Sequence, residues 1–494
     1  MYYVSTRDSS LRLTGAQAIV QGLSRDGGLL LPEYIPQLEN GALERLAALP
    51  YAKRAAAVMA LYLDEFTKDE LCGYAEKAYG PQKFDTPAVA PLVKVGDRTH
   101  VLELWHGPTC AFKDMALQML PYLLTASLRK TGEEKTACIL VATSGDTGKA
   151  ALEGFRDVPH TKILVFYPRD GVSDVQKLQM VTQEGENVGV CAVEGNFDDA
   201  QTGVKKIFSD EAVRQTLAEH GCFFSSANSI NWGRVLPQIA YYVSAYCDLL
   251  ASGQITAGQT VNVCVPTGNF GNILAALYAK NMGVPFGKLI CASNANNVLT
   301  DFIRTGVYDR NRPFYCTTSP SMDILISSNL ERLLYLLTGS DEAVRGYMQQ
   351  LADTGRYAVS ADVLEKIQQQ FACGFCDDHG TEKTIADVFA DWDYLPDTHT
   401  AVAWNVLRGY RTQTGDQTPT ILVSSASPFK FCTSVLNALG VHTHRPGVQV
   451  IQQLAEVSGR PAPAPLAALA GKAVRFDRCT TKDKMADAAL ELLL

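Results

Sequence analysis

The sequence lacks any long apolar run. No stretch approaches the roughly 18 to 20 consecutive apolar residues that a membrane-crossing helix needs, because Lys, Arg, Glu or Asp interrupts even the Leu-rich segments. The opening residues, Met1 to Asp8, have neither the pattern of a secretory signal nor that of an Arg- and Ser-rich presequence. We therefore expect a protein that does not span membranes and that resides in the cytoplasm.

Basic charge is also scarce. The net charge is -8, and the Lys and Arg residues are spread along the chain without the basic stripe that neutralises nucleic-acid phosphates. No internal repeat or low-complexity tract is present, which argues against a solenoid or scaffold. Nucleic acid is therefore not an expected partner.

The 13 cysteines do not form a metal-binding set. Cys373 and Cys376, with His379 three residues later, have a spacing that could begin a zinc site or a redox pair, but no second Cys pair follows at metal-site spacing. Other cysteines, such as Cys264, lie inside apolar runs, where a thiol acts as a small buried hydrophobe. We expect reduced core cysteines and no metal.

Length and composition favour a large α/β protein. A chain of 494 residues with 47% apolar and 19% charged residues can build two or three domains. From about residue 92, short apolar runs alternate with small polar turns and helical segments, as in an α/β sheet covered on both faces. The clearest strands are 137–142, 162–167 and 261–265. The expected parts are an N-terminal domain (1–92) and a catalytic region (93–494), which comprises a smaller lobe (about 130–225), a larger lobe (93–129 and 226–494) and a helical insertion (about 330–395).

Two loops that follow predicted strands are suited to binding anions. Residues 265–272 (Val-Pro-Thr-Gly-Asn-Phe-Gly-Asn) lead into a helix over 273–282, and residues 143–149 (Thr-Ser-Gly-Asp-Thr-Gly-Lys) lead into another. Glycines let the backbone N-H groups approach an anion, and the helix dipole favours negative charge. Neither loop matches a dinucleotide or Walker A pattern, and each could instead be a packing turn or a capped helix start.

A lysine follows a Gly-Pro turn in the segment His106-Gly-Pro-Thr-Cys-Ala-Phe-Lys113-Asp114. It stands at the entry to a helix predicted over 115–128. A partly desolvated lysine amine can form a Schiff base, although most lysines are solvated surface charges.

Together these segments resemble threonine synthase of the longer microbial type. The matching stretches recur in the family's order over most of the chain: Tyr3 to Arg7, Asp26 to Leu29, His106 to Asp114, Ser144 to Gly148, Ser226 to Asn231, Pro266 to Asn272, Pro320 to Ile324, Ser327 to Leu333 and Asp397 to Val402. The resemblance implies the tryptophan-synthase-β-like fold, fold type II among pyridoxal-phosphate enzymes, and pyridoxal 5'-phosphate as cofactor.

The resemblance also assigns residues to the cofactor. Lys113 would carry it covalently and later act as the general base, and Gly268, Asn269, Phe270 and Asn272 would hold its phosphate. Residues 423–431 resemble a family segment that usually reads Thr-Ala-His-Pro-Ala-Lys-Phe, so that Ser425 would face the pyridine nitrogen with a neutral hydroxyl. Ser427 and Phe429 depart from the family's His and Ala there.

By the same resemblance, the substrate would be held by the loop Ser144, Gly145, Asp146 and Thr147 and by Asn228, Ser229 and Asn231. Lys149, Arg234 and Lys430 are candidates for its phosphate, or else ordinary surface or interdomain charges. His106 and His399 stay outside the catalytic set, because an isolated His is more often a structural hydrogen bonder.

The implied reaction converts O-phospho-L-homoserine and water into L-threonine and phosphate, by γ-elimination followed by addition of water at Cβ, as the last step of threonine biosynthesis. A related lyase, such as threonine dehydratase or a β-replacing synthase, and a non-catalytic homologue that binds a phosphorylated ligand are the alternatives. The sequence does not distinguish a monomer from a homodimer.

Overall fold

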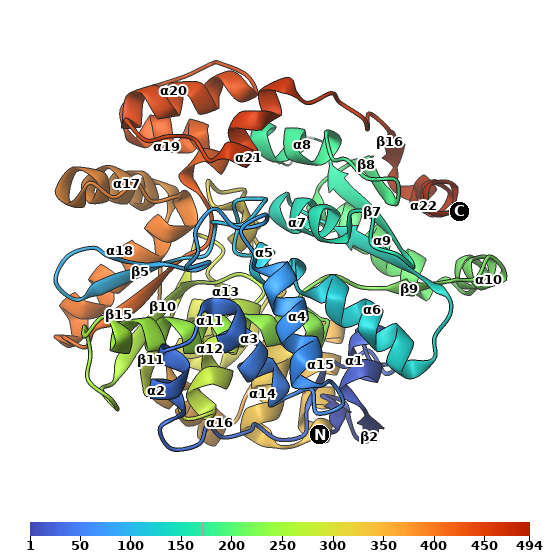
Figure 1. Cartoon of the computed structure of the whole chain (residues 1–494), viewed down its shortest axis with the longest axis horizontal. Coiled ribbons are helices and arrows are strands. Elements are labelled where there is room, and N and C mark those ends of the chain that lie inside the picture. The colour runs from blue at the N-terminus through green and yellow to red at the C-terminus, as the bar shows by residue number, and fades with distance from the viewer. Residues whose placement is uncertain (170–171) are drawn as a thin grey trace.

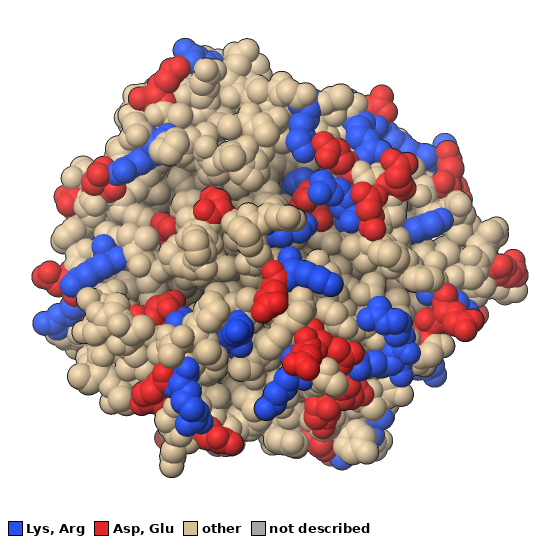
Figure 2. Space-filling model, in the orientation of Figure 1, with Lys and Arg blue, Asp and Glu red and all other residues tan. Residues whose placement is uncertain are grey.

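The computed structural model describes residues 1–169 and 172–494, which form an N-terminal unit and two α/β lobes (Figure 1). None of the described helices is both long enough and apolar enough to cross a membrane. On the face drawn in Figure 2, acidic and basic side chains are interspersed, with no broad area of one sign.

The N-terminal unit packs against the large lobe. Its three-stranded antiparallel sheet has the order β2-β1-β3, and its helix α4 begins with a capping box between Thr67 and Glu70. The buried Arg54 guanidinium donates hydrogen bonds to Ser244 and Asp248 on helix α11 (Trp232–Ala251), so this unit shares the core of the large lobe. Its elements are β1 (Tyr3–Ser5), β2 (Asp8–Leu13), α1 (Gly15–Gln21), β3 (Leu30–Pro32), α2 (Ala42–Ala47), α3 (Tyr51–Ala60) and α4 (Lys68–Ala78).

The large lobe contains a sheet in the order β14-β11-β10-β15-β5-β4, parallel except for the edge strand β4. Its central strands are buried on both faces, which is why they read as apolar runs in the sequence. The strands are β4 (Leu92–Lys94), β5 (Thr99–Glu103), β10 (Val261–Pro266), β11 (Phe286–Ser293), β14 (Phe371–Phe375) and β15 (Thr420–Ser424). The helices around them are α5 (Asp114–Leu117), α6 (Leu120–Thr131), α11, α12 (Gly271–Asn281), α13 (Val298–Thr305), α18 (Thr398–Thr414), α19 (Cys432–Ala438), α20 (Val448–Ser458) and α21 (Ala464–Ala467).

The small lobe is a parallel five-stranded sheet in the order β16-β8-β7-β6-β9. It comprises β6 (Thr136–Ala142), α7 (Asp146–Phe155), β7 (Thr161–Pro168), α8 (Asp174–Val181), β8 (Val188–Glu194), α9 (Phe197–Ser209), α10 (Glu211–Glu219), β9 (Cys222–Ser225), β16 (Cys479–Thr481) and α22 (Met485–Leu493). Strands β6, β7 and β10 confirm the three clearest strand predictions.

Three expectations differ from the structure. The predicted helix over 115–128 is two helices, because Pro121 cannot continue a helix from its preceding turn and instead occupies the first turn of α6. The expected insertion over 330–395 is mainly helical, but its strand β14 forms an edge of the large sheet. The end of the chain, expected in the large lobe, instead crosses to the small lobe, where β16 pairs with β8 (Figure 1).

The remaining described elements surround the site entrance and the insertion: β12 (Val307–Asp309), η1 (Pro320–Met322), α14 (Leu330–Thr338), α15 (Asp341–Thr354), β13 (Arg356–Ala358), α16 (Ala361–Gln370), α17 (Asp378–Trp392), η2 (Pro428–Lys430), η3 (Ala468–Gly471) and η4 (Lys482–Lys484).

Candidate active site

The predicted site segments all follow the carboxyl ends of neighbouring strands. In the large sheet, adjacent strands β10, β15 and β5 lead into the Gly268 loop, Ser425 and the Lys113 segment respectively. In the small lobe, adjacent strands β6 and β9 lead into the Ser144 loop and residues 226–231. Parallel strands bring such ends to one edge of a sheet, where open α/β folds bind ligands.

A large cavity between the lobes collects most of the predicted residues. Its volume is about 1700 Å³. Eleven of the sixteen predicted site residues line it: Lys113, Ser144, Thr147, Asn228, Ser229, Arg234, Gly268, Asn269, Phe270, Asn272 and Ser425. Loops from both lobes therefore face one space.

The chain around Lys113 is tied to the loop that carries Ser425. The N-H of Phe112 donates to the carbonyl oxygen of Ser425 at 2.7 Å, and Ala111 forms a β-bridge with Ala426. Lys113 itself is 9% exposed, and its Nζ has no hydrogen-bond partner among the described residues. The amine therefore lies in the cavity wall without a fixed partner.

Burial lowers the pKa of Lys113 to about 8. The Asp146 carboxylate opposes this shift, while the nearby cations of Arg234 and Lys430 add to it. A larger fraction of this amine is therefore uncharged near neutral pH than for an ordinary lysine, which suits a nucleophile or a general base.

The loop after β10 has the features of an anion site. No described residue accepts a hydrogen bond from the backbone N-H groups of Gly268 to Asn272, which open helix α12. A Cβ at Gly268 would lie 2.7 Å from the carbonyl oxygen of Ser321, so only glycine fits this position. Phe270 adopts a left-handed conformation with φ 61°, which turns the chain into the helix.

Asn272 is held by two tyrosines. The hydroxyls of Tyr241 and Tyr242 donate to its Oδ1 at 2.6 and 2.5 Å. Its Nδ2 is buried and has no acceptor among the described residues. Because this fixed amide leaves a donor unsatisfied at the edge of the cavity, it fits an acceptor on a bound ligand.

The loop after β6 forms a second set of free donors. Thr143 Oγ1 accepts from the N-H groups of Gly145 at 3.0 Å and Gly148 at 2.8 Å, which fixes the turn. The N-H groups of Ser144 and Thr147 find no acceptor among the described residues. Across the cavity, Arg234 Nε and Asn228 Oδ1 are also buried without partners. These groups are available to a polar ligand with negative charge.

Five predicted residues do not line the cavity. Asn231 caps helix α11, since its Oδ1 accepts from the N-H of Gly233 at 2.9 Å. Lys149 points to Glu153 at 3.3 Å and to Gln183. Gly145 packs its backbone on Gln176. Asp146 and Lys430, the remaining two, pair with each other.

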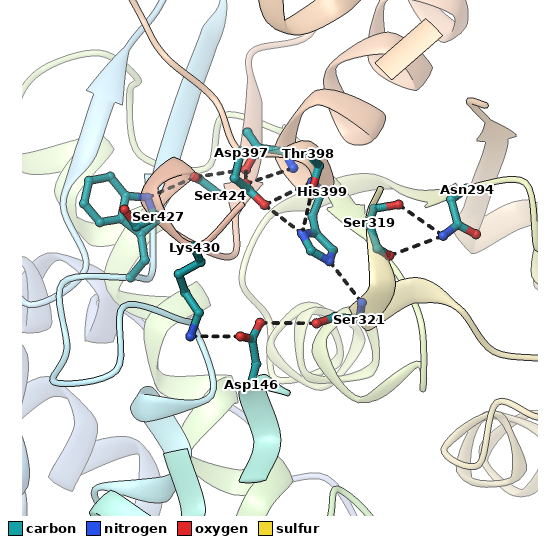
Figure 3. Close-up of polar contacts among 12 residues, drawn as sticks. Asp146, Asn294, Ser319, Ser321, Asp397, Thr398, His399, Ser424, Ser427 and Lys430 are labelled. Carbon is teal, nitrogen blue, oxygen red and sulfur yellow. Dashed lines mark hydrogen bonds and ion pairs between the residues drawn. The ribbon is translucent and has the colours of Figure 1, made fainter. Parts of the chain in front are cut away.

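Asp146 and Lys430 connect the two lobes (Figure 3). Lys430 is fully buried, and its Nζ lies 2.9 Å from Asp146 Oδ1 and 2.8 Å from the carbonyl oxygen of Thr109. The second oxygen of Asp146 accepts from the hydroxyl of Ser321 at 3.2 Å. Burial opposes ionisation of Asp146, but Lys430 and Lys113 lower its pKa well below the usual range.

The sequence argument missed His399, which lines the cavity. Its Nδ1 hydrogen-bonds to Asp397 at 2.7 Å, and its Nε2 accepts from the N-H of Ser321 at 3.2 Å (Figure 3). The Asp-Thr-His spacing was the available signal. By contrast, His106 contacts Asp85 and Glu103 and does not line this cavity.

The Cys373 and Cys376 thiols engage backbone oxygens of Thr300 and Asp377. Among the described residues, no group of three or more His, Cys, Asp or Glu side chains could hold a metal ion.

Comparisons with known proteins agree with this geometry. Residues 2–79 match the family described as threonine synthase N terminus, and residues 85–374 match the pyridoxal-phosphate dependent enzyme family. Threonine synthase of Saccharomyces cerevisiae is 37% identical over 469 residues, which cover 88% of this chain and 89% of that protein. A crystal structure of pyridoxal-phosphate-bound threonine synthase from Brucella melitensis superimposes with a TM-score of 0.87 and 36% identity, over 100% of this chain and 99% of that one.

A longer relative is the human protein threonine synthase-like 1, which is 40% identical over 437 residues. The match covers 86% of this chain and 58% of the human protein.

Proposed function

Because the chain belongs to the threonine synthase family of pyridoxal-phosphate-dependent enzymes, we propose that it binds pyridoxal 5'-phosphate and converts O-phospho-L-homoserine and water into L-threonine and inorganic phosphate. The observation that carries this proposal is the partly neutral, unpaired Lys113 amine in one cavity with two loops of free N-H donors.

The residues present fit the cofactor. The N-H groups from Gly268 to Asn272 and the unsatisfied Asn272 amide suit its phosphate. Ser425 lines the same cavity and offers a neutral hydroxyl for the ring nitrogen. When bound, the cofactor supplies an electron sink for carbanion chemistry at the substrate.

The chain's own groups would then act on the substrate. Lys113 would remove and return protons at Cα and Cβ as general base. The N-H groups of Ser144 and Thr147 would hold the carboxylate, and Arg234 the departing phosphate. We favour Arg234 over Lys149 and Lys430, because those two amines already have protein partners.

The proposed substrate is a small molecule, and no membrane partner is proposed. We propose a cytoplasmic location on the sequence grounds given above.

The test is to incubate the purified protein with pyridoxal phosphate and O-phospho-L-homoserine, and to follow threonine and phosphate together. Equal release of both, lost in Lys113→Ala and retained in the exposed control Lys53→Ala, is the expected result. Phosphate with 2-oxobutyrate would indicate a dehydratase. Binding without turnover would indicate the non-catalytic alternative.

A further inference from the structure

The cavity is larger than its proposed ligands require. Small-molecule pockets commonly measure about 300 to 1,000 Å³, whereas this one measures about 1700 Å³. The extra space is an outer vestibule lined by the loop after α1, by α9 and α10 of the small lobe and by the insertion. It extends beyond all the residues assigned above to cofactor or substrate.

The charge of the lining contrasts with that of the whole chain. The chain carries a net charge of -8, yet eight Lys and Arg side chains line the cavity against four Asp and Glu, counted over the described residues. Two of the four acids are already engaged: Glu331 is held by the guanidinium of Arg7, and Asp323 accepts hydrogen bonds from its own loop. An excess of positive charge is therefore left facing the cavity.

Three of these cations stand in the vestibule without partners. Arg25, Lys205 and Arg214 are exposed, and none forms an ion pair or a side-chain hydrogen bond with a described residue. They come from the N-terminal unit, from α9 and from α10 respectively, which lie on different sides of the opening. Glu133 and Glu211 also line it, so the excess is moderate.

We propose that Arg25, Lys205 and Arg214 form an anion-guiding vestibule that concentrates a doubly charged phosphorylated amino acid at the entrance. This inference rests on the proposed function, because a substrate with a phosphate and a carboxylate is drawn in by positive potential. Clefts lined by one sign of charge focus the field and raise the local concentration of an oppositely charged ligand. The three residues act before chemistry, so they affect KM and not kcat.

The test compares wild type with the triple variant Arg25→Gln, Lys205→Gln, Arg214→Gln at ionic strengths from about 0.02 M to about 0.5 M. At the lowest salt, kcat/KM of the variant should be about 3- to 10-fold lower than that of wild type, with kcat unchanged. The two proteins should converge at high salt, where the Debye length is a few ångströms.

A matched control is Lys53→Gln, Lys68→Gln, Lys484→Gln, which removes the same charge from exposed side chains outside the cavity. It should retain the salt dependence of wild type. An equal effect of both triples, an unchanged salt dependence in the vestibule variant, or a proportional fall in kcat would overturn the proposal.

Binding separates this proposal from the proposed reaction. L-2-Amino-5-phosphonopentanoate carries the same charges on an uncleavable chain, and calorimetry on the holoenzyme measures its Kd directly. The vestibule triple should weaken this binding at low salt and the control triple should not. If phosphohomoserine gives no threonine while the phosphonate still shows this pattern, the reaction fails and the vestibule stands; no difference in Kd sinks the vestibule alone.

Discussion

At the scale of single residues, the reactivity of Lys113 depends on how few charges stabilise its ammonium form. With a pKa of about 8, about one tenth of the amine is free base at pH 7, against less than about one thousandth for an ordinary lysine. Covalent capture of pyridoxal phosphate by the apo protein should therefore accelerate as pH rises and level off near pH 8. Stopped-flow absorbance measures this, and a rate still climbing steeply above pH 9.5 would contradict it.

Gly268 provides a second residue-scale prediction. An alanine there would place its Cβ 2.7 Å from the backbone oxygen of Ser321, so the loop must move. Because that loop supplies the free N-H donors, we expect Gly268→Ala to weaken cofactor phosphate binding by at least about tenfold, which equals about 1.4 kcal/mol. Equilibrium dialysis measures the affinity. The control Gly253→Ala meets no atom within 4 Å, although its φ of 66° costs some stability.

At the scale of elements, the buried pair between α7 and η2 links the lobes. Removing one partner of such a pair leaves an uncompensated charge and commonly costs about 3 to 5 kcal/mol. We expect Lys430→Met to destabilise the protein by about this amount and the double variant with Asp146→Asn to recover part of it. Urea denaturation measures both, and additive losses would argue against direct coupling.

The same pair has opposite effects on Lys113. Asp146 favours the charged ammonium of Lys113, and Lys430 disfavours it. The pH at which cofactor capture levels off should therefore fall in Asp146→Asn and rise in Lys430→Met. If both variants shift the midpoint in the same direction, a general disturbance of the site rather than electrostatics explains them.

Elements with a strong local pattern could be predicted from the sequence. The apolar runs of β6, β7 and β10 and the glycine-containing turns after them identified the site loops, because burial on both faces leaves a continuous apolar signal. Strands β14 and β16 carried no such signal: β14 contains Gly374 directly after a helix, and β16 is three residues long and partly exposed. The roles of Asp146, Lys430 and His399 depend on contacts between residues far apart in sequence, which no local pattern encodes.

At the scale of the whole molecule, the last residues of the chain complete the small lobe. Strand β16 pairs with β8, and α22 covers the outer face of the sheet through Met485, which is fully buried. A Cβ at Gly203 on α9 would lie 2.2 Å from the Met485 sulfur, so this contact is close. Cofactor and substrate loops on β6 and β9 therefore rest on a sheet whose edge is built by residues about 260 positions later.

Met485→Ala tests this dependence. Truncating a buried methionine leaves a cavity and commonly costs about 2 to 5 kcal/mol, and the loss should be concentrated in the small lobe. Hydrogen exchange should accelerate in β7, β8 and α9 while the large-lobe strands β10 and β15 keep their protection. Val474→Ala, a control whose side chain is 59% exposed, should change neither. Exchange that accelerates equally in both lobes would mean that they unfold as one cooperative unit, because the inner face of the small sheet belongs to the core that spans both lobes.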